Sequence, residues 1–200
     1  MPDKDESYSI IVPAYNEAVR VENVILKYSA EFTGEEIIIV CDGEDNTDDI
    51  VIGLSLKLPN IRLLSFGERL GKGGAIIEGF REAKGDIIGF VDADESVNPE
   101  DLRGMFEALR NVDGVIASRR LKESTILAKQ PIKRRAASKA FNILVRLLFD
   151  LPFKDTQCGA KVFKRKAVLD IIDDLETTGF EIDVEILWRL KNKQQFPLWL

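Results

Sequence analysis

Four polar clusters in the first half of the chain carry residue types that could bind a charged ligand. They occupy residues 13–17, 42–43, 69–74 and 92–94, and each follows an apolar run of strand length. One such cluster by itself could be a helix cap or a turn. Four of them at successive strand ends favour one shared site, because open α/β sheets bind ligands at the carboxyl ends of their strands.

The last of these clusters contains a pair of carboxylates, Asp92 and Asp94, separated by one residue. In an extended chain this spacing puts both side chains on one side. The pair could then hold a divalent cation that also binds a diphosphate and neutralises it as it leaves. The alternative is that Asp94 or Ser96 caps the following helix, and the spacing alone does not decide between the two.

The absence of histidine limits the available chemistry. The chain has no histidine and two cysteines, Cys41 and Cys158. Nucleophilic schemes that depend on a histidine base are therefore excluded, as are HExxH metalloproteases. A structural zinc site would need unusual ligands. Any bound metal should be a hard ion held by carboxylates, such as magnesium or manganese.

The third cluster is rich in glycine and reads GERLGKGG over residues 67–74. It is not a Walker loop, since Phe66 and Gly73 stand where that motif needs a glycine and a serine or threonine. It does not match GxGxxG either. It still predicts a flexible, cationic turn at a helix N-terminus, a place that suits phosphate. The alternative is a helix start that packs closely against the sheet.

The elements that must position these clusters alternate along the chain. We expect strands at 9–12, 36–41, 61–66, 86–91 and 112–117, and helices at 17–30, 50–58, 71–84 and from Asn98–Pro99 onward. Unbroken apolar strands that alternate with helices predict an α/β fold with a mostly parallel sheet covered on both faces. Beyond residue 118 we expect a helix at 131–149, a loop at 151–159, a strand at 160–163, helices at 166–175 and 181–193, and a strand at 195–200.

No linker divides the chain, so its 200 residues predict a single domain. There is no apolar run of about 18 residues that could span a membrane. The polar N-terminus lacks the apolar core of a signal peptide, which predicts a cytoplasmic protein with reduced cysteines.

Charge is unevenly distributed. The net charge is −6, yet residues 118–146 contain nine basic residues and one acidic residue. A single basic stretch on an acidic body predicts a local anionic partner and not a nucleic-acid surface. The alternative is a solvated basic helix.

Together these motifs resemble family 2 glycosyltransferases of the GT-A fold. The resemblance rests on IVPAYNE at 11–17, the Asp42–Gly43 turn, LGKGGA at 70–75 and DAD at 92–94, in that order. Ser118–Arg119–Arg120, the Arg134/Ser138 segment, DTQCGAK at 155–161 and GFEIDVE at 179–185 resemble the branch that uses polyprenyl phosphates, with DTQCG closer to its glucosyl members. Three positions depart from the family pattern, namely Cys41, Glu44 and Arg69.

The resemblance implies a single GT-A-type Rossmann-like domain and a hexosyltransferase activity. Residues 1–97 would bind the nucleotide sugar and residues 98–200 the acceptor. The implied reaction is inverting transfer of a hexose to a polyprenyl or dolichyl phosphate, from UDP-glucose by preference and GDP-mannose next. Two alternatives remain: a family 2 enzyme with a soluble saccharide acceptor, and a nucleotide-sugar-binding module without catalysis. A phosphate acceptor already carries about −1.5 to −2 charge, so it needs no strong general base.

The resemblance also assigns roles to residues. Asp92 and Asp94 would hold the magnesium or manganese ion, and they would act in catalysis with Arg119 and Arg134. The remaining residues divide into a donor set (Pro13, Tyr15, Glu17, Asp42 and Lys72, with Asp92) and an acceptor-phosphate set (Arg120, Arg134, Ser138 and Gln157). The roles of Glu181, Asp183 and Glu185 stay open.

The basic stretch then gains a second interpretation. Residues 133–153 combine basic side chains with an apolar series, as expected of a helix that rests on an anionic bilayer. This predicts peripheral association with the cytoplasmic face of a membrane. Alternatively, the apolar residues of this helix are core and the basic ones are solvated.

Overall fold

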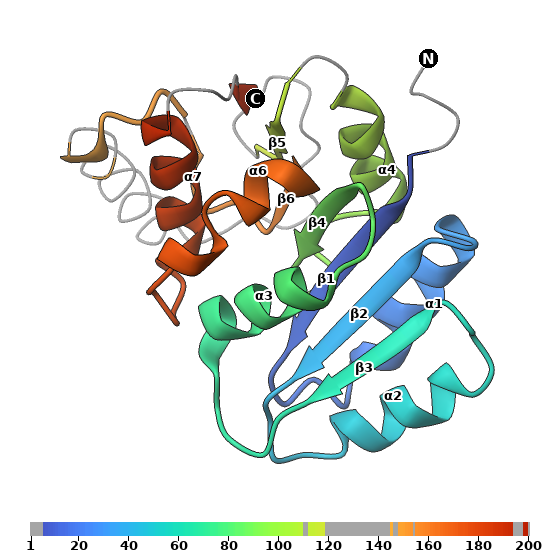
Figure 1. Ribbon diagram of the computed structural model, residues 1–200. Coiled ribbons are helices and arrows are strands. Elements are labelled where there is room, and N and C mark those ends of the chain that lie inside the picture. The colour runs from blue at the N-terminus through green and yellow to red at the C-terminus, as the bar shows by residue number, and fades with distance from the viewer. Residues whose placement is uncertain are drawn as a thin grey trace, which may run out of the picture.

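A seven-stranded sheet forms the centre of the protein in a computed structural model (Figure 1). The structure describes residues 6–109, 112–118, 145, 148–153, 155–193 and 198–199. The strand order is β3-β2-β1-β4-β6-β5-β7. The strands are β1 (Tyr8–Ala14), β2 (Glu36–Cys41), β3 (Ile61–Ser65), β4 (Ile87–Val91), β5 (Gly114–Ile116), β6 (Ala160–Lys164) and β7 (Leu198–Trp199).

The sheet is mostly parallel, as the sequence predicted. β1 pairs in parallel with β2 and β4, β2 with β3, and β5 with β7. β6 is antiparallel to both of its neighbours, β4 and β5. Strands from the second half of the chain therefore extend the sheet begun by the first half, and the described residues form one α/β domain.

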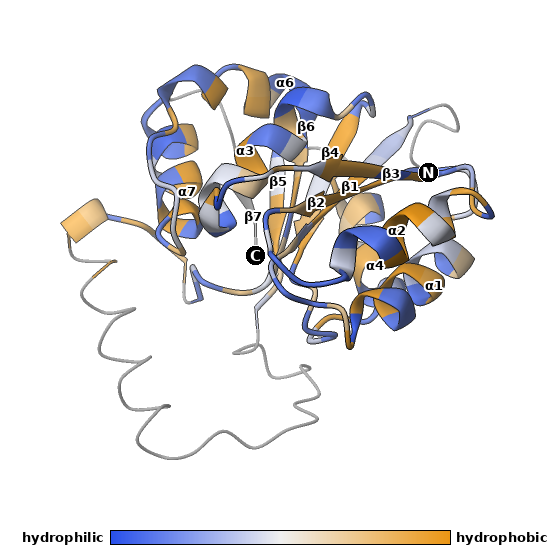
Figure 2. Ribbon diagram, turned by 90° about the horizontal axis from the view of Figure 1, so that it is seen from below, coloured by the Kyte–Doolittle hydropathy of each residue, from blue (hydrophilic) through white to orange (hydrophobic). Residues whose placement is uncertain are grey.

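Helices cover both faces of the sheet (Figure 2). One face carries α1 (Val21–Glu31), α2 (Thr47–Ser55) and α4 (Pro99–Ala108), and the other carries α3 (Gly71–Glu82), α6 (Arg165–Leu169) and α7 (Ile182–Asn192). α4 begins as expected, with Asn98 in an extended conformation and proline at the first helical position. No helix among the described residues is long and apolar enough to cross a membrane.

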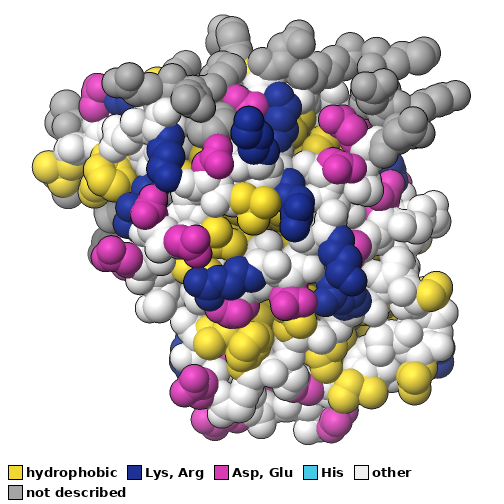
Figure 3. Space-filling model, in the orientation of Figure 1, with side chains coloured by type: hydrophobic (Ala, Val, Ile, Leu, Met, Phe, Trp, Pro, Cys, Tyr) yellow, Lys and Arg dark blue, Asp and Glu magenta, His cyan; other side chains and the backbone are white. Residues whose placement is uncertain are grey.

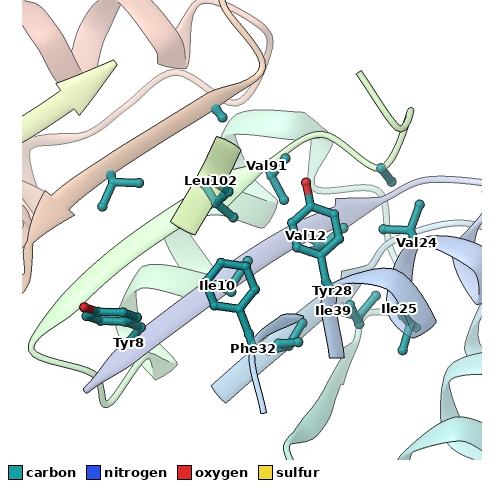
Figure 4. Packing of buried hydrophobic residues seen from close by; sticks show 14 of the residues in the cluster. Tyr8, Ile10, Val12, Val24, Ile25, Tyr28, Phe32, Ile39, Val91 and Leu102 are labelled. Carbon is teal, nitrogen blue, oxygen red and sulfur yellow. The ribbon is translucent and has the colours of Figure 1, made fainter. Parts of the chain in front are cut away.

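The core consists of two apolar layers, one on each side of the sheet. Ile10 and Val12 of β1 point into the layer beneath α1 and α4, where they meet Tyr28 and Phe32 (Figure 4). The intervening Ile11 lies in the other layer, beneath α3 and α7. Because both faces of each central strand are buried, the strands read as unbroken apolar runs.

Two expected helices need correction. The helix expected at 17–30 begins at Val21, after a turn in which the amide of Val21 donates to the carbonyl of Glu17. The helix expected at 166–175 is divided into α6 and a 3-10 turn, Ile172–Asp174. Two adjacent β-branched residues, Ile171 and Ile172, are both buried at this break, and such residues disfavour helix.

Two expectations fall largely on residues that the structure does not describe. Of the helix expected at 131–149, only residues 145, 148 and 149 are described, and all three are helical. Of the strand expected at 195–200, the described part is β7.

Candidate active site

The carboxyl ends of β1, β2 and β3 lie side by side. Ala14 is paired with Cys41, and Cys41 with Ser65, so these strands end at the same edge of the sheet. β4, which pairs with β1 in parallel, runs in the same direction. The four polar clusters therefore follow parallel strands that end at a common edge, as the sequence predicted.

Asn16 connects the first two clusters. Its backbone has a left-handed φ of 55°, which asparagine tolerates better than most residues. Its side-chain oxygen accepts hydrogen bonds from the amides of Glu44 at 2.9 Å and Asp45 at 3.3 Å. A Cβ atom at Gly43 would lie 2.6 Å from that oxygen, so the approach requires glycine. Asn16 was missing from the predicted site, although its place within the 13–17 turn is the signal that could have found it.

Asp42 connects the second cluster to the third. Its side chain is buried, and Oδ2 accepts hydrogen bonds from the amides of Leu70 at 2.9 Å and Gly71 at 2.8 Å. A carboxylate at the beginning of α3 also interacts favourably with the helix dipole. Asp42 thus holds the glycine-rich turn in place, and its predicted contact with the base or ribose stays a prediction.

The glycine-rich turn packs against a loop that is distant in the sequence. The amide of Gly73 donates to the carbonyl of Thr178 at 2.8 Å. A Cβ atom at Gly71 or Gly73 would collide with the backbone carbonyl oxygen of Thr178 or Thr177, respectively. Close packing therefore explains these two glycines. It favours the second interpretation of the motif, in which the helix start packs closely, with the loop at 177–178 as its partner and not the sheet.

Lys72 projects from this turn into a buried group of charges. Its ammonium group lies 2.9 Å from Asp92 Oδ1 and 2.9 Å from Asp183 Oδ2. Burial alone would lower the pKa of Lys72, but the two carboxylates outweigh that effect and raise it. Lys72 therefore remains charged beside the DxD pair. Its predicted contact with the donor would come from this ammonium group.

The two carboxylates of the DxD pair have different surroundings. Asp92 is partly buried; its amide donates to the carbonyl of Gly159 at 2.9 Å, and a Cβ atom at Gly159 would lie 2.5 Å from Asp92 Oδ2. Burial raises the pKa of Asp92 above its ordinary value, although Lys72 opposes this. Asp94 is exposed, and its Oδ1 accepts a hydrogen bond from the amide of Ser96 at 3.0 Å.

The expectation that the chain is extended through Asp92 and Asp94 is wrong. β4 ends at Val91, and Ala93 and Asp94 already lie in a turn. The hydrogen bond of Asp94 belongs to this turn, whereas α4 begins later, after Asn98. The alternative interpretation of Asp94 as the cap of that helix is therefore wrong as well.

The donor set includes an exposed aromatic ring. Tyr15 is 41% exposed, and the guanidinium carbon of Arg69 lies 3.3 Å from the centre of its ring. This is a close cation–π contact. Glu17 accepts two hydrogen bonds from its neighbour Arg20, both at 2.9 Å. Pro13 lies within β1 and is paired with Val40.

The predicted acceptor residues lie mostly outside the described part of the chain. Arg119, Arg120, Arg134 and Ser138 are all outside it. Gln157 is described and partly buried, in the loop that precedes β6. Asp155, in the same loop, is buried. On the face seen in Figure 3, basic and acidic side chains of the described residues are interspersed. The nine basic residues of the predicted basic stretch all lie outside the described residues.

The residues at the end of β4 fit a hard divalent cation. Asp92 and Asp94 supply carboxylate oxygens, the ligands that Mg²⁺ and Mn²⁺ prefer. No group of three or more potential protein ligands occurs among the described residues. Two carboxylates are nevertheless enough for magnesium, which is often bound by one or two of them together with substrate phosphates.

Cys41 occupies the position where the family pattern has an aspartate. Its thiol is buried at the end of β2. Burial raises its pKa, and the carboxylates of Asp48, Asp42 and Asp45 raise it further. This thiol is therefore neutral and unreactive, and it replaces a charged side chain with a small apolar one.

Glu185 supports the loop on which the glycine-rich turn packs. It accepts hydrogen bonds from the amide of Thr177 at 2.9 Å, from the hydroxyl of Thr177 at 2.7 Å and from Arg189 at 2.8 Å. Burial alone would raise the pKa of Glu185, but these bonds lower it below its ordinary value of 4.5. Glu185 therefore braces an arginine and a loop.

We expect Glu185→Gln to lower the free energy of unfolding at pH 7 by about 2 kcal/mol, because hydrogen bonds to a charged group are lost. Since the folded pKa is lowered, this stabilisation is complete above the ordinary value of 4.5 and disappears as the pH falls through the folded pKa. Urea unfolding of both proteins between pH 3 and pH 8 measures the difference. A difference that stays constant down to pH 3 would contradict this assignment.

The fold and this edge of the sheet define a GT-A-type glycosyltransferase domain, with a DxD pair at the end of β4. Residues 9–172 match the family described as Glycosyl transferase family 2. The chain belongs to this family.

Named relatives agree with this assignment. The chain is 34% identical over 193 residues to the glycosyltransferase AglD of Haloferax volcanii, covering 92% of this chain and 31% of the relative. It is 33% identical over 208 residues to a dolichyl-phosphate β-glucosyltransferase of Dictyostelium discoideum, covering 95% and 63%, respectively. The chain thus spans between about a third and two thirds of these relatives.

The fold resembles that of Mycobacterium tuberculosis glucosyl-3-phosphoglycerate synthase, crystallised with Mn²⁺, UDP-glucose and phosphoglyceric acid. The TM-score is 0.70 at 18% identity, covering 94% of this chain and 66% of that one. This likeness confirms the expected fold class.

Proposed function

We propose that this chain is the catalytic part of an enzyme that transfers a hexose from a nucleotide sugar, UDP-glucose by preference, to a polyprenyl phosphate. The observation that carries the proposal is the match along 95% of the chain to a relative named as a dolichyl-phosphate β-glucosyltransferase. The intact Asp92/Asp94 pair, with Lys72 beside it, supports catalysis over a module that only binds.

In this proposal the donor lies across the carboxyl edge of β1, β2 and β4. Tyr15, exposed and in contact with Arg69, offers a ring face to the base. Pro13 lies just before it at the end of β1, and Glu17 and Asp42 complete the nucleotide pocket. Lys72 donates to the diphosphate, because its ammonium group lies beside Asp92 at the end of β4.

A magnesium or manganese ion fits at Asp92 and Asp94. When bound, such an ion would neutralise the charge of the departing nucleoside diphosphate. The two carboxylates differ in how they are held: Asp92 is fixed by its neighbours, while Asp94 is exposed in a turn. Crystallisation of the structural neighbour with Mn²⁺ and UDP-glucose supports this assignment.

The acceptor site would be formed by arginines and a polar loop. Arg119, Arg120, Arg134 and Ser138 would bind the phosphate, with Gln157 in the loop before β6. Arginine suits this task, because its planar fork donates two parallel hydrogen bonds. The phosphate oxygen attacks the anomeric carbon as the diphosphate leaves, which gives inversion. A phosphate dianion needs no proton removed before it attacks.

A donor screen tests this function. The protein is incubated with Mn²⁺, a short polyprenyl phosphate and labelled UDP-glucose, GDP-mannose or other nucleotide sugars, and label in the organic phase is counted. We expect UDP-glucose to give the largest signal. No transfer to the lipid from any donor, with transfer to a soluble saccharide instead, would favour the alternative enzyme. Binding of nucleotide without any transfer would favour the binding module.

We also propose that the enzyme lies peripherally on the cytoplasmic face of a membrane. The described end of the segment 133–153 supports this, because Leu148 is 68% exposed and Phe149 is 39% exposed. Each basic residue near an anionic surface contributes about 1 kcal/mol to binding. We therefore expect co-sedimentation with phosphatidylserine vesicles at low salt and release at high salt.

A matched pair of variants tests this surface. Replacement of Lys133, Arg135 and Lys139 by Gln should reduce vesicle binding. Replacement of three exposed basic residues elsewhere, Lys57, Arg81 and Lys84, removes the same charge and should leave most binding intact. Equal losses in the two variants, or no binding of the wild type at low salt, would refute the proposal.

A further inference from the structure

A largely buried chain of alternating charges connects β6, α7 and α3 to the residue that follows β4. Its members are Lys161, Asp183, Lys72 and Asp92, and we refer to them as the ion chain. Lys161 on β6 is fully buried, and its ammonium group donates to Asp183 Oδ1 and, at 2.9 Å, to the carbonyl of Cys158. Asp183 Oδ2 accepts from Lys72 at 2.9 Å, and Lys72 lies 2.9 Å from Asp92 Oδ1.

The ion chain brings together residues from separate motifs. Lys161 belongs to DTQCGAK, Asp183 to the first turn of α7, Lys72 to the glycine-rich turn and Asp92 to the DxD pair. Two ammonium groups and two carboxylates balance in charge. This balance matters, because an unpaired charge in a buried place is strongly destabilising.

Asp183 is 1% exposed, and each of its two oxygens accepts a hydrogen bond from a different lysine. A general base needs an oxygen that can reach the proton it removes. Both oxygens of Asp183 are already engaged in the interior, so its contribution must act through the lysines.

Lys72 is shared between two carboxylates, and this sharing has a consequence for Asp92. A divalent cation and the Lys72 ammonium group compete for the Asp92 oxygens. With Asp183 present, Lys72 has a second anionic partner at the same distance of 2.9 Å. The Lys72 ammonium group can then remain paired with Asp183 while Asp92 turns to the cation. The ammonium group also stays close to where a diphosphate would bind.

We propose that Asp183 is a positioning residue of the donor site: it shares Lys72 with Asp92 and thereby keeps Asp92 available to a divalent cation. This inference rests on the proposed function, since it concerns the same donor site. If Asp183 acts in this way, the loss of Asp183 and the loss of Lys161 should act in opposite directions on metal affinity.

The direction of each change in metal affinity follows from the order of charges along the ion chain. In Asp183→Asn, Lys72 keeps one carboxylate, Asp92, and binds it more tightly, so a cation must displace it. In Lys161→Met, Asp183 loses its other cation and attracts Lys72 more strongly, which frees Asp92. A purely structural role would lower stability in both variants and leave the metal affinity without this opposite pattern.

The experiment is a titration with Mn²⁺ followed by electron paramagnetic resonance, with and without UDP. We expect the Mn²⁺ Kd of Asp183→Asn in the presence of UDP to rise about tenfold, as is usual for residues that orient metal ligands. Lys161→Met should show a lower Kd, because Asp92 is freed from Lys72. Melting temperatures are recorded for every variant.

A double variant and a distant control separate an effect on metal binding from a general loss of stability. Asp183→Asn leaves Lys161 without its carboxylate and could fail to fold. Lys161→Met combined with Asp183→Asn removes both members of that pair and should still show the raised Kd. Glu36→Gln breaks a half-buried ion pair with Arg62, on β2 and β3, and should lower stability without changing the Kd.

The proposal is overturned if both Asp183 variants bind Mn²⁺ within twofold of the wild type, if Glu36→Gln raises the Kd equally, or if the wild type binds no Mn²⁺ with or without UDP. Failure of the proposed function is a separate result. In that case Mn²⁺ and UDP bind and respond to Asp183 as expected, yet no sugar reaches a polyprenyl phosphate.

Discussion

Asp94→Ala should lower the rate of sugar transfer by on the order of 10²- to 10³-fold, the usual cost of removing one group that stabilises charge in a transition state. Asp94 is exposed, and its hydrogen bond to the Ser96 amide is local to the turn. We therefore expect the melting temperature to change by less than about 4 °C, the shift that corresponds to about 1 kcal/mol in a chain of this size. Initial rates with UDP-glucose, polyprenyl phosphate and Mn²⁺ measure the loss, and excess EDTA should reproduce it in the wild type.

The adjacent residue provides the matched control. Glu95 is also exposed, and its carboxylate is engaged on the surface by Lys27 and Asn23, both at 2.6 Å. Glu95→Ala removes one carboxylate from the same turn and should leave the transfer rate within about twofold, because exposed ion pairs contribute little. Near-normal transfer by Asp94→Ala, or an equal loss in Glu95→Ala, would show that the DxD pair does not carry the metal chemistry.

The strands and their common edge could be predicted because each depends on a local pattern. A strand buried on both faces must be an unbroken apolar run, and β1, β2 and β4 are such runs. The polar clusters then had to meet at the carboxyl edge. The insertion of β6 between β4 and β5 could not be read from the same patterns, because pairing order is set by contacts between distant segments.

The ion chain could not be predicted, for a related reason. Lys72 and Asp183 are 111 residues apart in the sequence, and no spacing rule connects them. A lysine within a strand is ordinarily expected at the surface, yet Lys161 is fully buried because Asp183 neutralises it. Side chains whose role depends on a distant partner become recognisable only in the fold.

The role of the glycine-rich turn could not be predicted either, because two interpretations fitted its sequence. A cationic turn at a helix N-terminus and a tightly packed helix start require the same residues. The structure favours packing, since the amides of Leu70 and Gly71 bond to Asp42 and that of Gly73 bonds to Thr178. These three backbone donors are already used within the protein, whereas the ammonium group of Lys72 lies beside Asp92 of the DxD pair.

Gly73→Ala should therefore be strongly destabilising. Its Cβ atom would collide with the backbone carbonyl of Thr177 and lie 2.9 Å from the Cα of Thr178, so a loop or a helix must shift. Overpacking of this kind costs about 3 kcal/mol, which corresponds to a decrease in melting temperature of roughly 6–12 °C for a chain of this size. Because α3 carries Lys72, the same shift should weaken the binding of UDP in the presence of Mn²⁺, measured by calorimetry.

Two other helical glycines serve as controls for this prediction. Gly53 in α2 and Gly104 in α4 are exposed, and a Cβ atom at either position would meet nothing within 4 Å. Alanine at these sites should raise stability by about 0.5–1 kcal/mol, because glycine is the poorer helix former. If Gly73→Ala instead behaves like Gly53→Ala and Gly104→Ala, then α3 does not pack on the loop at 177–178 as described, and the arrangement that places Lys72 between Asp92 and Asp183 is wrong with it.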